Sequence, residues 1–385
     1  MALYYITFGT IEQFDDMQLG VIPAANQKID YVINKLNDLQ KNFHVISLAK
    51  TERKYMRFYK GKTVSCTPHG KYTVWNTFGN PNLVFRIIHR VYRLYQLYRF
   101  LSSLSSEDVV IVYHSLFYAE LVYKLHKKKK FKLILEVEEV YQDIVKCSKR
   151  TALYENKIIQ SADGYILVAD TLISKIPNDK PYIIFNGTYH AEPVIDAPAE
   201  DGKIHCVYAG NCSPIQGCAS AAVSSAEFLP SNYHVHILGV GPDKEIKLIK
   251  EQINKMQSKI SCTLTFDGFK TGKDFLQFLQ SCHIGLNPQD PAGSYVNTSF
   301  HSKILVYLAN GLRVVSGNIP TVKQSAIGDL LAYYDHQTPQ EIARAIMSVD
   351  VTKPYDSRAR LQQLDQKFQQ DLKQLLEYFT HEKTN

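Results

Sequence analysis

The chain has 385 residues, of which 45% are hydrophobic and 21% are charged. This length exceeds one ordinary hydrophobic core and suits two domains, and the composition excludes a disordered or low-complexity chain. No apolar stretch approaches the roughly 20 residues that a membrane-spanning helix needs. The net charge of +7 is modest, but much of the excess lies between Arg86 and Lys132, which indicates a surface for anions.

The first residues and the cysteines indicate a cytosolic protein. The N-terminal segment, 1–8, lacks the basic flank and cleavage site of a signal peptide and predicts a β-strand instead. The seven cysteines are odd in number and form no C-x-x-C pair, so we expect neither a disulfide framework nor a structural zinc site.

In the first half of the chain, short β-branched and aromatic runs alternate with helical patterns, which predicts a parallel sheet with crossover helices. The helical pattern at 25–40 carries its apolar residues on one face. The predicted strands are 3–8, 43–47, 109–113, 132–137, 164–168 and 182–185.

The second half repeats this alternation after a linker at 190–202, and the chain closes with a long amphipathic helix at 357–378. Its predicted strands are 203–208, 233–238, 263–266, 284–286 and 313–316. We therefore predict two doubly wound α/β domains at 1–187 and 188–356, followed by a C-terminal segment at 357–385. Such domains bind ligands in a crevice at the carboxyl ends of their strands.

A glycine-bearing turn follows the strand that ends at Tyr208. Gly210 and Asn211 come directly after it, and a small-residue helix begins near Gly217. A glycine lets the backbone approach a ligand, and a helix N-terminus favours an anion such as a diphosphate. Taken alone, the segment fits an ordinary strand-to-helix turn better than a ligand site, and it is not a dinucleotide-binding fingerprint.

The most informative stretch is 297–316, a polar loop followed by a helix, a glycine and a buried strand. The free N–H groups of the loop and Lys303 are suited to a pyrophosphate. The run resembles the S-F-P-S-K-(I/L)-x-E-Y-L-A-x-G-x-P-V-(V/I)-S stretch of GT-B glycosyltransferases, particularly the family 4 members of bacterial surface-polysaccharide synthesis. Further segments resemble these enzymes in the expected order, at 135–141, 184–187, 207–210, 237–241, 266–268 and 283–288.

The chain departs from the family 4 pattern at several charged positions. Thr298 and Val306 stand where the pattern has two glutamates, of which the second normally grips the ribose of the donor. Asn211 and Gln216 stand where it has a phosphate-binding arginine and lysine, which leaves Lys303 as the clearest cation for a diphosphate.

The resemblance implies a nucleotide diphosphate-sugar donor, and a UDP-sugar is the first candidate. It also implies that the enzyme needs no separate cofactor or metal ion and that the sugar is transferred with retention of anomeric configuration. It implies that the two domains face a central cleft and that the C-terminal helix at 357–385 crosses back to pack on the first domain. It assigns the acceptor to the first domain and the catalytic roles to His114, Glu138 and Lys303. For His114 and Glu138 the alternative is that strand-end polar residues cap neighbouring loops. The donor contacts that it implies are Gly9, Gly210, Asn211, Gly268, Thr298, Ser299, Phe300, Ser302 and Lys303.

A basic helical segment at 86–101 is a candidate membrane contact. Ile87, Val91 and Leu94 share one helical face with Tyr98 and Leu101, and four arginines lie around the rest. Basic amphipathic helices rich in aromatic residues bind anionic membrane surfaces. The alternative is a helix whose apolar face packs on the core. No module that binds nucleic acid accompanies the charge, so we expect no nucleic-acid partner.

We therefore predict a glycosyltransferase at the inner face of the plasma membrane that acts on a glycan or a lipid-linked glycan. The rival hypothesis is a catalytically inactive GT-B subunit that supports a partner transferase, and the residues at 211, 216, 298 and 306 favour it. A GT-B sugar epimerase is a third hypothesis, for which we find no matching carboxylate pair. The sequence does not distinguish a monomer from a homo-oligomer.

Overall fold

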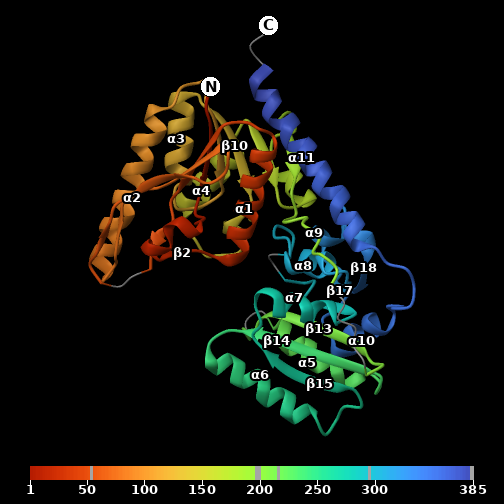
Figure 1. The fold of residues 1–385 in the computed structure, drawn as a ribbon. Helices are drawn as coiled ribbons and strands as arrows, with labels where there is room; N and C mark the ends of the chain where they lie inside the picture. The colour runs from red at the N-terminus through yellow and green to blue at the C-terminus, as the bar shows by residue number, and fades with distance from the viewer. Residues whose placement is uncertain (53–54, 196–200, 215–216, 294–295, 382–385) are drawn as a thin grey trace. The chain divides into compact units, whose positions relative to one another are not determined.

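The computed structural model describes residues 1–52, 55–195, 201–214, 217–293 and 296–381, which form two compact α/β units (Figure 1). Unit 1 comprises Met1–Thr188 and Lys367–Asn385, and unit 2 comprises Tyr189–Gln366. Each unit contains one large, mainly parallel sheet, so the predicted fold class is confirmed.

The sheet of unit 1 has the strand order β12-β11-β10-β9-β1-β3-β7-β6. All six predicted strands are present and pair in parallel. Their near-continuous runs of β-branched and aromatic residues suit strands that are covered on both faces. The six strands are β1 (Leu3–Thr7), β3 (Phe43–Ser47), β9 (Val109–Tyr113), β10 (Lys132–Val137), β11 (Gly164–Leu167) and β12 (Tyr182–Ile184).

Two further strands extend this sheet beyond the prediction. β7 (Gly70–Val74) pairs in parallel with β3, and β6 (Lys62–Ser65) pairs antiparallel with β7 at the edge. β7 alternates between polar and apolar side chains, and β6 is mainly polar and exposed, so both lack the apolar run that marks the other strands. The helices of unit 1 are α1 (Pro23–Asp38), α2 (Leu83–Ser103), α3 (Ala119–Lys129) and α4 (Lys149–Ile159).

The sheet of unit 2 has the order β15-β14-β13-β16-β17-β18, and every pair is parallel. The five predicted strands are β13 (Ile204–Asn211), β14 (Tyr233–Val240), β15 (Thr263–Gly268), β16 (Ile284–Asn287) and β17 (Arg313–Gly317). β18 (Leu331–Tyr334) was not predicted; it is a short strand at the edge of the sheet, and its residues are only partly buried apart from the last. The helices are α5 (Cys218–Ser225), α6 (Asp243–Met256), α7 (Gly272–Gln280), α8 (Lys303–Ala309), α9 (Pro320–Lys323) and α10 (Pro339–Met347).

The two units also contain short strands and 3₁₀ helices. Two small antiparallel ladders join β2 (Leu19–Gly20) to β4 (Lys50–Thr51) and β5 (Phe58–Tyr59) to β8 (Thr77–Phe78). The 3₁₀ helices are η1 (Glu12–Met17), η2 (Tyr141–Asp143), η3 (Asp170–Lys175), η4 (Ala226–Phe228) and η5 (Gly328–Leu330).

The last helix, α11 (Ser357–His381), contributes to both units. Its first ten residues group with unit 2, where the Ser357 hydroxyl donates to the Leu308 carbonyl at 2.7 Å. From Lys367 onward it groups with unit 1, and the Phe368 ring stacks on Phe185 with centroids 4.5 Å apart. The chain therefore returns to its first unit after completing the second sheet.

Candidate functional site

The strand order of unit 2 reverses between β13 and β16, which is where doubly wound sheets bind ligands at the carboxyl ends of strands. Gly210 and Asn211 end β13, and Lys303 opens α8 beside them. The Lys303 Nζ atom lies 4.6 Å from the centre of the Tyr208 ring. It also lies 3.1 Å from the point that a Cβ atom on Gly210 would occupy. The structure thus brings Gly210, Asn211 and Lys303 together.

Tyr307, one helical turn after Lys303, fixes α8 against the sheet. Its hydroxyl accepts the N–H of Ala209 at 2.8 Å and donates to the carbonyl of Leu286 at 3.3 Å. Gly285 provides the space, because a Cβ atom there would overlap the Tyr307 ring. These contacts tie α8 to the carboxyl-terminal parts of β13 and β16, so rigid elements set the position of Lys303.

The Lys303 ammonium has no anionic partner among the described residues. None of them accepts a hydrogen bond from Nζ or forms an ion pair with it, and its one ring contact is with Tyr208. Burial lowers the pKa of Lys303, and Cys218 opposes this effect. A partly desolvated cation without a counter-charge is costly, so the site favours an incoming anion.

The segment that follows β13 provides a second feature that suits an anion, the N-terminus of α5. Gly217, with φ of +66°, directly precedes α5, and a Cβ atom on it would meet nothing within 4 Å. The open space at this helix N-terminus suits a phosphate, whose charge the helix dipole favours. Gln216, which stands at the position of the family 4 lysine, lies outside the described residues.

The other predicted donor residues have different environments. Gly268 ends β15, two strands from β13, and a Cβ atom on it would meet open space. Thr298 and Phe300 are buried, while Ser299 and Ser302 are half-buried. The Thr298 hydroxyl has no hydrogen-bond partner among the described residues, so this buried oxygen is available to a ligand or a water molecule.

In unit 1, His114 follows β9 and is fully buried. Its Nδ1 atom lies 3.1 Å from the Glu139 carbonyl, and its Nε2 atom lies 3.6 Å from Glu155 Oε1, too far for a hydrogen bond. Burial lowers the pKa of His114 to about 4, so the ring is neutral at pH 7. In this conformation no acceptor hydroxyl can reach it, and a role as a base requires a local opening.

Glu138, which follows β10, forms a buried ion pair with Lys28 of α1. The sequence did not indicate this partner, which lies 110 positions away. Gly9 follows β1 and is surrounded by protein atoms: a Cβ atom there would lie 3.0 Å from Asn26 Oδ1 and 3.1 Å from the Tyr72 hydroxyl. Close packing therefore accounts for the glycine without a ligand.

Unit 1 also holds a basic pocket of about 290 Å³ that sequence reasoning did not identify. Lys50, Arg86, Arg90 and Arg93 line it together with Phe117. The Arg93 guanidinium lies 4.6 Å from the centre of the Phe117 ring and donates to the Leu48 carbonyl. Burial lowers the pKa of Arg93 to about 10, which leaves it charged at pH 7. The excess of positive charge at 86–132 in the sequence indicated a basic surface. Only the fold shows that Lys50 lies in the same pocket as the arginines.

No protein-family model and no curated protein sequence matches the chain. Solved structures match it over nearly its whole length. The α,α-trehalose-phosphate synthase (UDP-forming) from Burkholderia vietnamiensis is similar with a TM-score of 0.66 and 10% identity, over 98% of this chain and 99% of that one. Sucrose-phosphate synthase from Thermosynechococcus elongatus is similar with a TM-score of 0.67 and 13% identity, over 99% of both chains.

The structure of Anabaena Alr3699/HepE in complex with UDP is also similar, with a TM-score of 0.65 and 10% identity, over 99% of this chain and 100% of that one. The chain has the GT-B fold. Identities of this size establish a fold and not a family, so the resemblance to family 4 stays a prediction.

Proposed function

We propose that this GT-B protein is a glycosyltransferase that moves a sugar from a nucleotide diphosphate-sugar to a glycan or lipid-linked glycan in surface-polysaccharide synthesis. The observation that carries the proposal is the Lys303 ammonium at the switch point of unit 2, to which no described residue offers an anionic partner. UDP-sugar is the first candidate donor, because similar structures include a UDP complex and a UDP-forming synthase.

In this proposal the residues of unit 2 stabilise the departing diphosphate. Lys303 and the N–H groups at the start of α5 would meet the negative charge as the bond from the anomeric carbon to the diphosphate breaks. This role is electrostatic and requires no proton transfer from the protein. The family 4 resemblance adds retention of configuration and independence of metal ions, and Thr298 and Val306 supply no carboxylate for the ribose.

The basic pocket of unit 1 supports an acceptor that carries phosphate. Its four cations surround a space that is large enough for a phosphate group, and arginine binds phosphate through two parallel N–H bonds. Leu83 and Ile87 also line the pocket, so it combines charge with apolar surface. A lipid-linked phosphate has this same combination.

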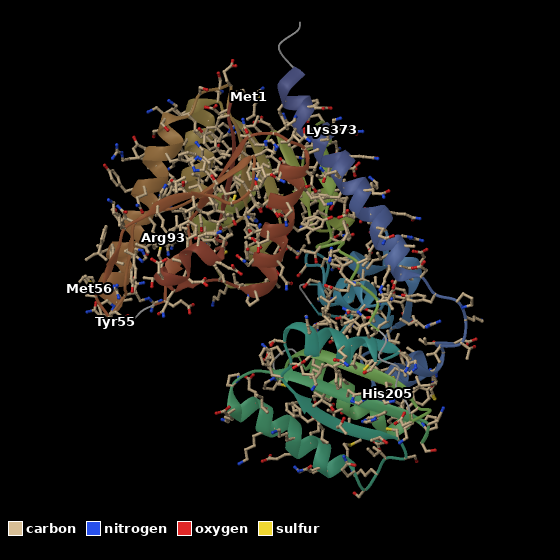
Figure 2. All side chains as sticks on the ribbon, viewed as in Figure 1. Met1, Tyr55, Met56, Arg93, His205 and Lys373 are labelled. Carbon is tan, nitrogen blue, oxygen red and sulfur yellow. The ribbon has the colours of Figure 1, made fainter. Side chains whose placement is uncertain are left out.

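The outer face of α2 supports contact with an anionic membrane surface. Ile87 and Val91, which a core-facing helix would bury, are 57% and 61% exposed. Arg86, Arg90 and Arg99 are exposed on the same helix. Figure 2 shows Tyr55 and Met56 at an outer tip of unit 1, and both are more than half exposed. These exposed apolar and basic side chains carry our proposal of peripheral binding at the cytoplasmic face. Among the described residues, none of the helices could span a bilayer.

Nucleotide titration tests the donor site. We expect micromolar binding of one nucleoside diphosphate, with UDP first in the panel, and a loss of roughly 30-fold or more in affinity in Lys303→Ala, since a charged contact is removed. The measurement is isothermal titration calorimetry on both proteins. Lys250→Ala is the matched control, because Lys250 also lies over an aromatic ring of unit 2, 4.9 Å from the centre of Phe266.

Equal affinity of Lys303→Ala and wild type would show that the nucleotide binds elsewhere. If folded wild-type protein binds no nucleoside diphosphate, the enzyme proposal fails and the supporting-subunit hypothesis replaces it. Hydrolysis of a UDP-sugar or transfer to a lipid-linked glycan would then be absent as well.

Vesicle binding tests the membrane face. Val84→Asp/Val91→Asp is expected to reduce sedimentation with phosphatidylglycerol vesicles by about 30-fold or more, because two apolar contacts become anionic. Both residues belong to unit 1 and neither is part of the nucleotide site of unit 2, so nucleotide binding should not change. Neither residue lines the basic pocket. Leu248→Asp on α6, at a position 47% exposed, is the control for an exposed apolar-to-acidic change. If wild type and the double variant sediment equally with the vesicles, this face of α2 does not bind the membrane surface.

A further inference from the structure

Three histidines converge on one face of the sheet of unit 2. His205 of β13 lies opposite His234 of β14 in the strand register, and His236 lies two residues further along β14. Side chains two residues apart share a face of a sheet, so all three imidazoles project to the same side. One ring nitrogen of each lies within 4.8 Å of the others. Figure 2 shows His205 within this sheet.

His205 and His236 face each other through one ring nitrogen each, the inner nitrogens. The other nitrogen of each ring, the outer nitrogen, lies beside a carboxylate. His205 Nε2 lies 2.8 Å from Asp201 Oδ1, and His236 Nδ1 lies 3.1 Å from Asp267 Oδ2. Since an ionised carboxylate only accepts hydrogen bonds, each of these nitrogens carries a proton. This arrangement fixes the tautomer and leaves a lone pair on the inner nitrogen of each ring.

The inner nitrogens, His205 Nδ1 and His236 Nε2, face each other at 2.8 Å. Two lone pairs at this distance repel each other unless a positive charge lies between or beside them. Either a shared proton or a metal ion supplies that charge, and two aspartates balance it from outside.

His234 completes the cluster. Its ring stacks on His236 with centroids 3.8 Å apart, and its Nε2 atom lies 3.0 Å from the Thr265 hydroxyl. That hydroxyl is also 2.8 Å from Asp267 Oδ2, to which it donates. Thr265 therefore accepts from His234 Nε2–H, and the Nδ1 atom keeps a lone pair. Each of the three rings thus presents one unprotonated nitrogen.

We propose that His205, His234 and His236 bind one divalent transition-metal ion, with zinc as the first candidate. Neutral imidazole nitrogens are preferred ligands of zinc, and carboxylates on the outer nitrogens are the usual second layer of such sites. A water molecule would complete a tetrahedral set.

The proposed site is separate from the nucleotide site. His205 and His234 are each the second residue of their strand, whereas Gly210 and Asn211 lie at the opposite, carboxyl end of β13. The metal would therefore join β13 to β14 and stabilise unit 2 without contacting the donor. The hypothesis is independent of the proposed function.

Cobalt titration of untagged protein tests the site. We expect one Co²⁺ per chain, with visible absorption bands of a tetrahedral ion, and displacement of Co²⁺ by Zn²⁺. His234→Gln and His236→Gln each remove one ligand and should weaken binding by roughly 100-fold or more, whereas Asp267→Asn should weaken it by about 10- to 100-fold. His336→Gln, at an exposed histidine of unit 2 that pairs with Glu341, is the matched control and should bind like wild type.

Folded wild-type protein that binds no cobalt or zinc at 100-fold molar excess over chain (roughly the level that reveals millimolar sites) would overturn the proposal in favour of the shared proton. Equal binding by wild type and His236→Gln would overturn it too. Since a histidine variant can fail to fold, the outcome is also read on wild type alone, where added Zn²⁺ should raise the melting temperature and a chelator should reverse the rise.

Discussion

Replacing Phe368 by alanine is expected to lower the free energy of unfolding of unit 1 by about 3–5 kcal/mol, the range for removing a buried phenylalanine. The ring is 1% exposed and stacks on Phe185, with a second aromatic contact to Tyr31 at 5.7 Å between centroids. Tyr31 and Phe185 stack on each other at 5.2 Å. Alanine would therefore open a cavity between α11, α1 and the segment after β12, and remove aromatic contacts as well.

Tryptophan fluorescence during urea denaturation measures this effect in unit 1 alone. The chain has one tryptophan, Trp75, which lies in unit 1 next to β7 and contacts Phe100. Tyr378→Ala is the control on the same helix, because Tyr378 is 48% exposed and should cost little. If the Trp75 transition of Phe368→Ala matches that of wild type, α11 does not stabilise unit 1 in solution.

The strands of both sheets were largely predictable, because buried parallel strands carry continuous apolar runs. β3, β9 and β10 were predicted with their observed bounds. The edge strand β6 and its neighbour β7 were not predicted, because polar residues interrupt their apolar pattern and make each resemble a loop. The sequence also leaves open which side of an amphipathic helix faces the core, and on α2 only His89, Leu97 and Leu101 are buried.

The candidate site was predictable only where neighbours in the chain are neighbours in space. Lys303 and its helix follow directly from one contiguous segment. The Lys28–Glu138 pair and the contact between His205 and His236 depend on strand order and register, which periodicity does not provide. The His-x-His spacing at 234–236 was a usable signal, since alternate strand residues share a face.

Glu136 gives the second large effect, because this carboxyl is fully buried in β10. The Tyr5 hydroxyl donates to its Oε2 atom at 2.7 Å, while its Oε1 atom has no partner among the described residues. Burial raises the pKa of Glu136 to about 8, and the nearby Glu138 adds to the effect. At pH 7 the folded protein therefore holds a proton on Glu136.

The sign of the pH dependence follows from proton binding in the two states. The unfolded chain releases the Glu136 proton near pH 4.5, whereas the folded chain keeps it until about pH 8. Between these values the folded state binds one more proton, so the free energy of unfolding falls as pH rises. The contribution of Glu136 across this window is about 3–5 kcal/mol, at about 1.4 kcal/mol for each unit of pKa difference.

Glu136→Gln is expected to remove this decline, because glutamine keeps the acceptor for Tyr5 and does not ionise. The measurement is the Trp75 unfolding transition from pH 5 to pH 9 in wild type and variant, and the difference between the two curves isolates Glu136 from His114 and Glu155. Tyr5→Phe should extend the decline to higher pH, since the lost hydrogen bond favours the charged carboxylate. Parallel curves for wild type and Glu136→Gln would show that the buried carboxyl titrates as it does in the unfolded chain.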